Sequence, residues 1–185
     1  MKKSRFLDEL QVDELSYGAA MCLWGFRVSV VAHARCRCVD PSFEAAFGDQ
    51  GQRAREDLRD LVSGLVEEGK RQIWMAVPAS LEITCDEVCI LNALAAAQHD
   101  QIEALQAHLR WLLGRDAVPD DLMNRFVNAG ALLYSHGYAA QPPARQPLQG
   151  VASPVNAQTR APSNVSVRSH ETLDEQLADV SLVES

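Results

Sequence analysis

The sequence predicts a mainly α protein: a single multi-helix domain over residues 1–137, with a small β-hairpin inserted between helices, and a disordered C-terminal tail over residues 138–185. Three observations lead to this fold class. Apolar residues recur at the i, i+3, i+4 spacing of a buried helical face through most of the first 137 residues. Residues that favour helix starts and stops bracket these stretches. After Gly137, large apolar residues give way to proline, glutamine, serine and alanine, a composition that cannot form a core.

Length and composition fit one ordinary globular domain. The chain has 185 residues, of which 47% are hydrophobic and 23% are charged, and a chain of this size has room for one sizeable core. The formal net charge of −8 argues against binding to nucleic acid or to an anionic membrane, because both require a surface excess of Lys and Arg.

Targeting signals and cysteine usage predict a cytoplasmic protein. Acidic residues from Asp8 onward follow the opening lysines where a signal peptide needs an apolar stretch. The most apolar run, residues 19–34, contains Arg27 and is too short to span a bilayer. An odd number of cysteines, five, does not suggest a secreted disulfide framework. Arg outnumbers Lys by 14 to 3, a bias typical of GC-rich bacterial genomes.

The first half of the chain predicts three helices. The first long helix covers residues 16–35, and we expect its buried stripe to contain Tyr17, Met21, Trp24, Val28 and Val31. Asp40 and Pro41 predict the start of a short helix that ends at Gly48. A third helix over residues 52–68 has its apolar stripe at Leu58, Leu61, Val62 and Leu65.

Residues 71–84 break the helical period. Short, partly alternating apolar runs flank Pro78-Ala79 and predict a β-hairpin, with a loop wider than two residues because Pro-Ala does not favour a tight turn. Thr84 and Glu87 then form a capping box, in which the Thr hydroxyl accepts from the Glu backbone N–H and the Glu side chain accepts from the Thr N–H. A central helix is therefore expected to start at this point.

Two further helices complete the predicted domain. Asp100 and Glu103 repeat the capping pattern before an amphipathic stretch that stops at Gly114. Pro119 and Asp120 open the last helix, which ends at Gly137.

The tail contains one amphipathic stretch. Thr172 and Glu175 form another capping box, which predicts a short helix over residues 172–183 on which Leu173, Leu177 and Val180 share one face. These three residues are the predicted partner-binding residues, in a helix-in-groove mode. The alternative is a solvated tail in which this spacing arises by chance.

The cysteines provide the candidates for metal or thiol chemistry. His33, Cys36 and Cys38 are weak candidate metal ligands, because a tetrahedral zinc site needs a fourth group from elsewhere in the fold. The competing interpretation is that they are ordinary reduced thiols near a turn. Cys85 and Cys89 lie one helical turn apart, and packing as small hydrophobic residues is the favoured interpretation.

Two polar features are interpreted as structural. Arg27 lies within an apolar helix and, if buried, needs a carboxylate or backbone acceptors. His108 and Trp111 could form a stacking patch, but Trp at helical spacing is more often part of the core.

The sequence contains no Gly-rich phosphate loop, nucleophile elbow, metalloprotease motif or kinase signature. We therefore expect a non-enzymatic protein–protein interaction or regulatory module with a protein partner and no cofactor, in which the helical domain holds the tail or the tail docks elsewhere. The alternatives are a DNA-binding regulator, with residues 84–114 as a helix-turn-helix, and a metal or thiol site at the cysteines.

Overall fold

The computed structural model describes residues 6–31, 39–141 and 164–167, and it confirms the mainly helical fold. The helices are α1 (Tyr17–Val31), α2 (Asp40–Phe47), α3 (Gly51–Glu68), α4 (Cys85–Gln98), α5 (Ile102–Leu113) and α6 (Asp120–Ser135). The strands are β1 (Phe6–Gln11), β2 (Ile73–Ala76), β3 (Glu82–Thr84) and β4 (Asn164–Val167), and short 3-10 turns cover Val12–Glu14 and Gly48–Gln50.

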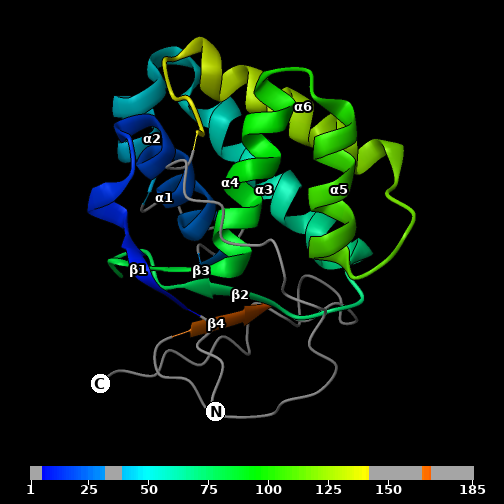
Figure 1. Cartoon of the computed structure of the whole chain (residues 1–185). Coiled ribbons are helices and arrows are strands. Elements are labelled where there is room, and N and C mark those ends of the chain that lie inside the picture. Colours follow the sequence, from blue (N-terminus) through cyan, green and yellow to red (C-terminus); the bar gives the residue numbers. More distant parts are fainter. Residues whose placement is uncertain (1–5, 32–38, 142–163, 168–185) are drawn as a thin grey trace.

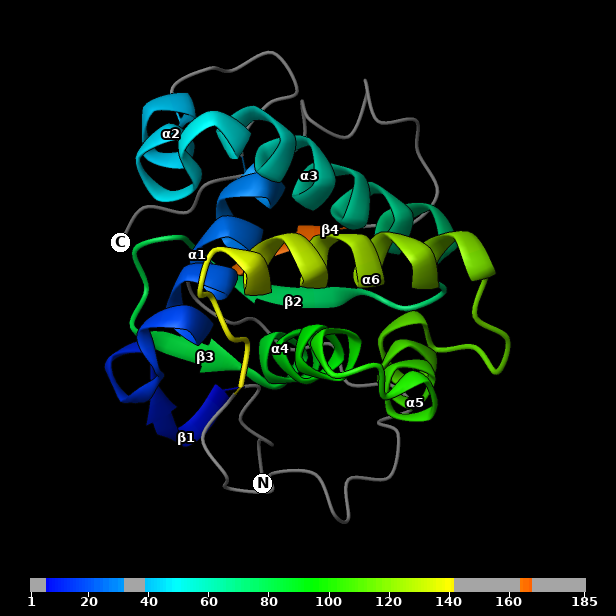
Figure 2. The same cartoon turned by 90° about the horizontal axis from the view of Figure 1, so that it is seen from above.

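The helices surround α4, which contacts α5, α6 and α1. Helices α3 and α6 lie side by side (Figure 2). The strands lie together beneath the helices, at the end where α4 begins (Figure 1). Most faces of α4 are buried, as its nearly continuous apolar sequence predicts.

The buried face of α1 differs from the predicted stripe. Ala19, Leu23 and Phe26 are almost fully buried, whereas Tyr17 is 73% exposed and Trp24 is only partly buried. Because α1 is apolar on nearly every side, the spacing of its apolar residues does not identify which face points inward. Of the predicted stripe, Val28 is buried, Met21, Trp24 and Val31 are only partly buried, and Tyr17 is exposed, so the prediction was wrong for most of the stripe.

The predicted ends of α2 and α3 are confirmed within one residue. Helix α2 starts at Asp40, and Gly48 follows its end with a positive φ of 55°. The turn into α3 is tight, because a Cβ atom on Gly51 would lie 2.8 Å from the backbone N of Glu44. Arg55 of α3 donates a hydrogen bond to Asp40, which ties the two helices together.

The two strands predicted between α3 and α4 are present, but their pairing differs from a hairpin. Strand β3 pairs antiparallel with β1, and β2 pairs antiparallel with β4. The facing edges of β2 and β3 are bridged by side chains, because Glu87 accepts hydrogen bonds from Ala76 N at 3.0 Å and from Thr84 N at 2.8 Å. The Glu87 carboxylate thus replaces the backbone hydrogen bonds that would have joined β2 and β3 in a hairpin.

The helical domain extends beyond the predicted boundary at Gly137. Gly137, with φ of 81°, ends α6, but Tyr138 and Ala140 are both buried in the core. The Tyr138 hydroxyl donates to the Ala46 carbonyl at 2.8 Å, and the Gln98 side chain bonds both the Tyr138 carbonyl and the Ala140 N–H. We call residues 138–141 the strap.

Four residues of the predicted tail, Asn164–Val167, form strand β4. The rest of that region, residues 142–163 and 168–185, lies outside the described residues, and so does the predicted helix over 172–183. Within the described ranges, no helix combines the length and apolar character needed to cross a bilayer.

Candidate functional site

Strand β2 has two edges with different partners. Its inner edge faces the start of α4: the Trp74 N–H donates to Asp86 Oδ2 at 2.6 Å, and the Trp74 carbonyl accepts from Thr84 Oγ1 at 2.7 Å. The Ala76 N–H on the same edge donates to Glu87 Oε1. Since backbone groups alternate in direction along a strand, the N–H and C=O groups of Ile73 and Met75 point to the opposite, outer edge.

Strand β4 occupies this outer edge. The register pairs Ile73 with Val167, Trp74 with Ser166, Met75 with Val165 and Ala76 with Asn164. A segment from far along the chain therefore adds one strand to the edge of β2 (Figure 1). This arrangement is the geometry of peptide recognition by strand addition.

A buried ion pair holds the inner edge in place. Arg27 of α1 is 2% exposed and donates to Glu87 through Nε at 2.7 Å and Nη2 at 3.0 Å. Its remaining donors reach the carbonyls of Ser80 and Glu82, each at 2.7 Å. The charged groups are thus fully compensated, as a buried pair requires. The interpretation of Arg27 as a structural ion-pair residue agrees with this geometry.

A second charged cluster supports the start of β2. Arg71 donates to Asp86 Oδ1 at 2.6 Å and to the Trp111 carbonyl at 2.8 Å. Its guanidinium carbon lies 4.1 Å from the centre of the Trp111 ring, a cation–π contact. Trp111 therefore has a structural role here, as expected.

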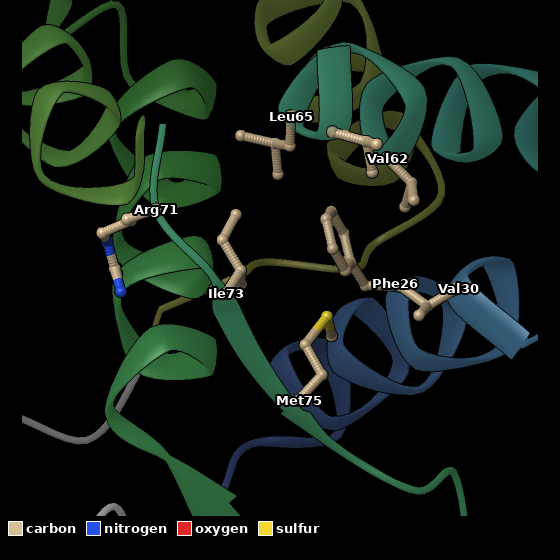
Figure 3. Close-up of a pocket in the computed structure, with 8 residues that line it drawn as sticks. Phe26, Val30, Val62, Leu65, Arg71, Ile73 and Met75 are labelled. Atoms are coloured by element: carbon tan, nitrogen blue, oxygen red, sulfur yellow. The ribbon is translucent and has the colours of Figure 1, made fainter. Parts of the chain in front are cut away.

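An apolar hollow lies beside β2, between α1 and α3. It is small, with a cavity volume of about 20 Å³, and it is partly open to solvent. Figure 3 shows Ile73 and Met75 of β2 pointing into it, together with side chains of both helices, while the charged end of Arg71 points away. The residues that line the hollow are Phe26, Val30, Val62, Leu65, Val66, Arg71, Ile73 and Met75.

A thiol and an imidazole come together elsewhere in the domain. Cys89 Sγ lies 3.6 Å from His108 Nδ1, a neighbour that the sequence did not reveal. Burial raises the pKa of the Cys89 thiol above its ordinary value and lowers the pKa of His108. Both groups are therefore neutral near pH 7, which is the opposite of the thiolate–imidazolium pair that a cysteine nucleophile uses.

The remaining thiols in the described part of the chain are also structural. Burial raises the pKa of Cys22 to about 12, and its Sγ lies 3.7 Å from the Tyr138 carbonyl. Burial also raises the pKa of Cys85, with Asp86 as a second cause. These values keep the thiols protonated and apolar in character.

The other predicted site residues lie outside the described ranges. These are the metal candidates His33, Cys36 and Cys38 and the partner-binding candidates Leu173, Leu177 and Val180. Among residues 6–31, 39–141 and 164–167, no group of three or more His, Cys, Asp and Glu side chains is arranged to hold a metal ion.

Helices α4 and α5 are joined by three residues, as in a helix-turn-helix. The exposed face of α5, however, presents both Glu103 and Arg110. Arg110 donates to the Asp116 carbonyl at 2.9 Å and to Gln106 at 3.3 Å. This surface lacks the excess of free cations with which recognition helices contact DNA.

The outer edge of β2 was not identified from the sequence. The alternating Asn164-Val165-Ser166-Val167 is a short strand signal, but the surrounding polar composition concealed it. Compared with family models, curated proteins and solved structures, the chain shows no significant match.

Proposed function

We propose that this protein is a non-enzymatic interaction module that binds an extended protein segment by strand addition along the outer edge of β2. The observation that carries the proposal is the antiparallel pairing of β2 with β4, a segment remote in sequence. Main-chain hydrogen bonds provide affinity in this mode, and pockets for alternate side chains provide specificity.

The rigidity of β2 supports this role. Its inner edge is bonded to Asp86, Glu87 and Thr84 at the start of α4, and the Arg27 ion pair holds Glu87 in turn. A preorganised edge loses little conformational entropy when a ligand strand binds.

The apolar hollow supports it as well. Ile73 and Met75 face the hollow, and in an antiparallel pair the residues opposite them lie on the same face. A bound strand with apolar residues at alternate positions would therefore cover this surface.

The chemistry-bearing groups near the site are engaged in structural contacts. Arg27, Arg71, Asp86 and Glu87 bind one another or the backbone, and burial keeps the Cys89 thiol protonated. These assignments favour binding over catalysis.

The test is to select binding peptides from a display library on the full chain and then to N-methylate them at alternate residues. Only one set of peptide N–H groups faces β2 in strand addition. We expect methylation of that set to abolish binding and methylation of the other set to leave it intact. Equal tolerance of both sets would contradict strand addition.

A matched pair of protein variants locates the site. Val62 lines the hollow on α3, and Val127 on α6 is also partly buried against the core but does not line it. Val62→Glu should weaken peptide binding, whereas Val127→Glu should not. Loss of binding in both variants at equal folded fraction would place the peptide elsewhere.

A further inference from the structure

We infer that Asn164–Val167 is a resident ligand in cis, and that the external partner is an extended segment with aliphatic residues at alternate positions that must displace it. This inference rests on the proposed function of the β2 edge. It adds the chemistry of the ligand and a mechanism that limits access to the site.

The register defines the ligand pattern. Val165 and Val167 are paired with Met75 and Ile73, the two β2 residues that line the hollow. The intervening Ser166 is paired with Trp74, which is not among the lining residues. An antiparallel segment therefore matches the edge when it has aliphatic residues opposite Met75 and Ile73 and a small polar residue between them.

The hollow indicates which aliphatic residues a competitor should carry. It holds space within an apolar lining beyond Ile73 and Met75. Leu or Ile at the paired positions adds one methylene relative to Val, and each buried methylene strengthens binding by about fourfold. We therefore expect a segment with Leu or Ile at these positions to bind the edge more tightly than the same segment with Val.

The covalent connection sets the barrier to displacement. Strand β4 belongs to the same chain, so pairing with β2 is intramolecular, with an effective concentration on the order of millimolar. An external segment binds only the fraction of molecules in which the edge is free, and its apparent affinity falls by that fraction. Pairing of β4 with β2 thus prevents weakly binding segments from occupying the edge.

The experiment uses three versions of the full chain: the parent and two variants. The parent is compared with a Val165→Pro, Ser166→Pro variant, in which two successive residues lose their N–H groups so that the ladder is broken whichever of the two faces β2. The matched control is Ala157→Pro, Gln158→Pro, which adds the same two prolines outside β4.

Two measurements are made on each version. Fluorescence anisotropy gives the Kd of a labelled peptide with the sequence of residues 161–170, and of a second peptide with Leu in place of both valines. Hydrogen exchange by NMR reports whether the Ile73 and Met75 amides are protected, with α4 amides as a control for folding.

We expect the β4 variant to bind the valine peptide at least about tenfold more tightly than the parent and the control variant. The Ile73 and Met75 amides should lose protection only in the β4 variant and regain it when peptide is added. The Leu peptide should bind more tightly than the valine peptide.

Three results would overturn the inference, and they can be told apart. Equal Kd in all three proteins refutes occupancy in cis but leaves peptide binding intact. Unprotected Ile73 and Met75 amides in the parent show that β4 does not occupy the edge. An edge that opens in the β4 variant but binds neither peptide refutes both this inference and the proposed function.

Discussion

At the scale of single residues, Glu87 combines three tasks that the sequence presents separately. Its carboxylate completes the capping box with Thr84, bonds Ala76 on the inner edge of β2, and neutralises Arg27. The spacing of Thr84 and Glu87 predicts the cap. The apolar residues around Arg27 predict that it needs an acidic partner. The sequence does not predict that one side chain meets both needs, because Arg27 and Glu87 are 60 positions apart.

We predict that Arg27→Met lowers the free energy of unfolding by about 3–5 kcal/mol, because the buried Glu87 charge loses its partner. The control is Arg59→Met, which removes a partly exposed ion pair with Asp60 and should cost no more than about 1 kcal/mol. Urea denaturation measures both values. Similar losses in the two variants would mean that the Arg27 pair is as weakly coupled to folding as a surface pair.

Burial on α1 leads to a second prediction. Phe26 is 1% exposed, so Phe26→Ala should cost about 3–5 kcal/mol. Trp24 is partly exposed and its ring lies 5.4 Å from that of Phe43, so Trp24→Ala should cost less, about 0.5–3 kcal/mol. Denaturant titrations measure both losses of unfolding free energy. A larger loss for Trp24→Ala than for Phe26→Ala would show that the face containing Tyr17 and Trp24 is the core face.

At the scale of elements, the strap behaves as part of the core although it has no regular secondary structure. Tyr138 contacts Phe47 edge to face at 5.2 Å between ring centres, and the Gln98 amide mimics a strand by bonding both a carbonyl and an N–H of the strap. On the other side, a Cβ atom on Gly18 would lie 2.6 Å from Ala139 N, so glycine is required for the strap to cross α1.

We predict that a chain ending at Gly137 melts several degrees below one ending at Gln141. Both lack β4, so the comparison isolates the strap, and the shorter chain loses a buried aromatic side chain and its hydrogen bonds. Differential scanning calorimetry measures the two midpoints. In the full chain, Gly18→Ala should reproduce part of the loss. Equal midpoints for the two truncated chains would show that the strap adds no stability.

At the scale of the whole molecule, local signals predicted more than long-range pairing. The helix ends at Gly48, Thr84 and Gly114 follow from capping and glycine preferences that act over a few residues. Strand pairing depends on which edges are left free after the helices pack, and that information is spread over the chain. The hairpin prediction was wrong for this reason, since β3 pairs with β1 and β2 with β4.

The candidate site was harder to predict than the fold. The residues that line the hollow come from α1, α3, β2 and the connection between α3 and β2, and none of them belongs to a motif. The sequence could supply the valine alternation in β4 but not the edge that receives it. The predicted cysteine and tail residues lie outside the described ranges, so they stay predictions.

The separation of 60 residues between Arg27 and Glu87 also has a consequence during synthesis on the ribosome. Translation proceeds at about 5–20 residues per second, so the Glu87 codon is read roughly 3–12 s after the Arg27 codon. During that interval α1 cannot be buried without an uncompensated charge. We therefore expect the Arg27 face of α1 to stay hydrated until the start of α4 has emerged from the exit tunnel.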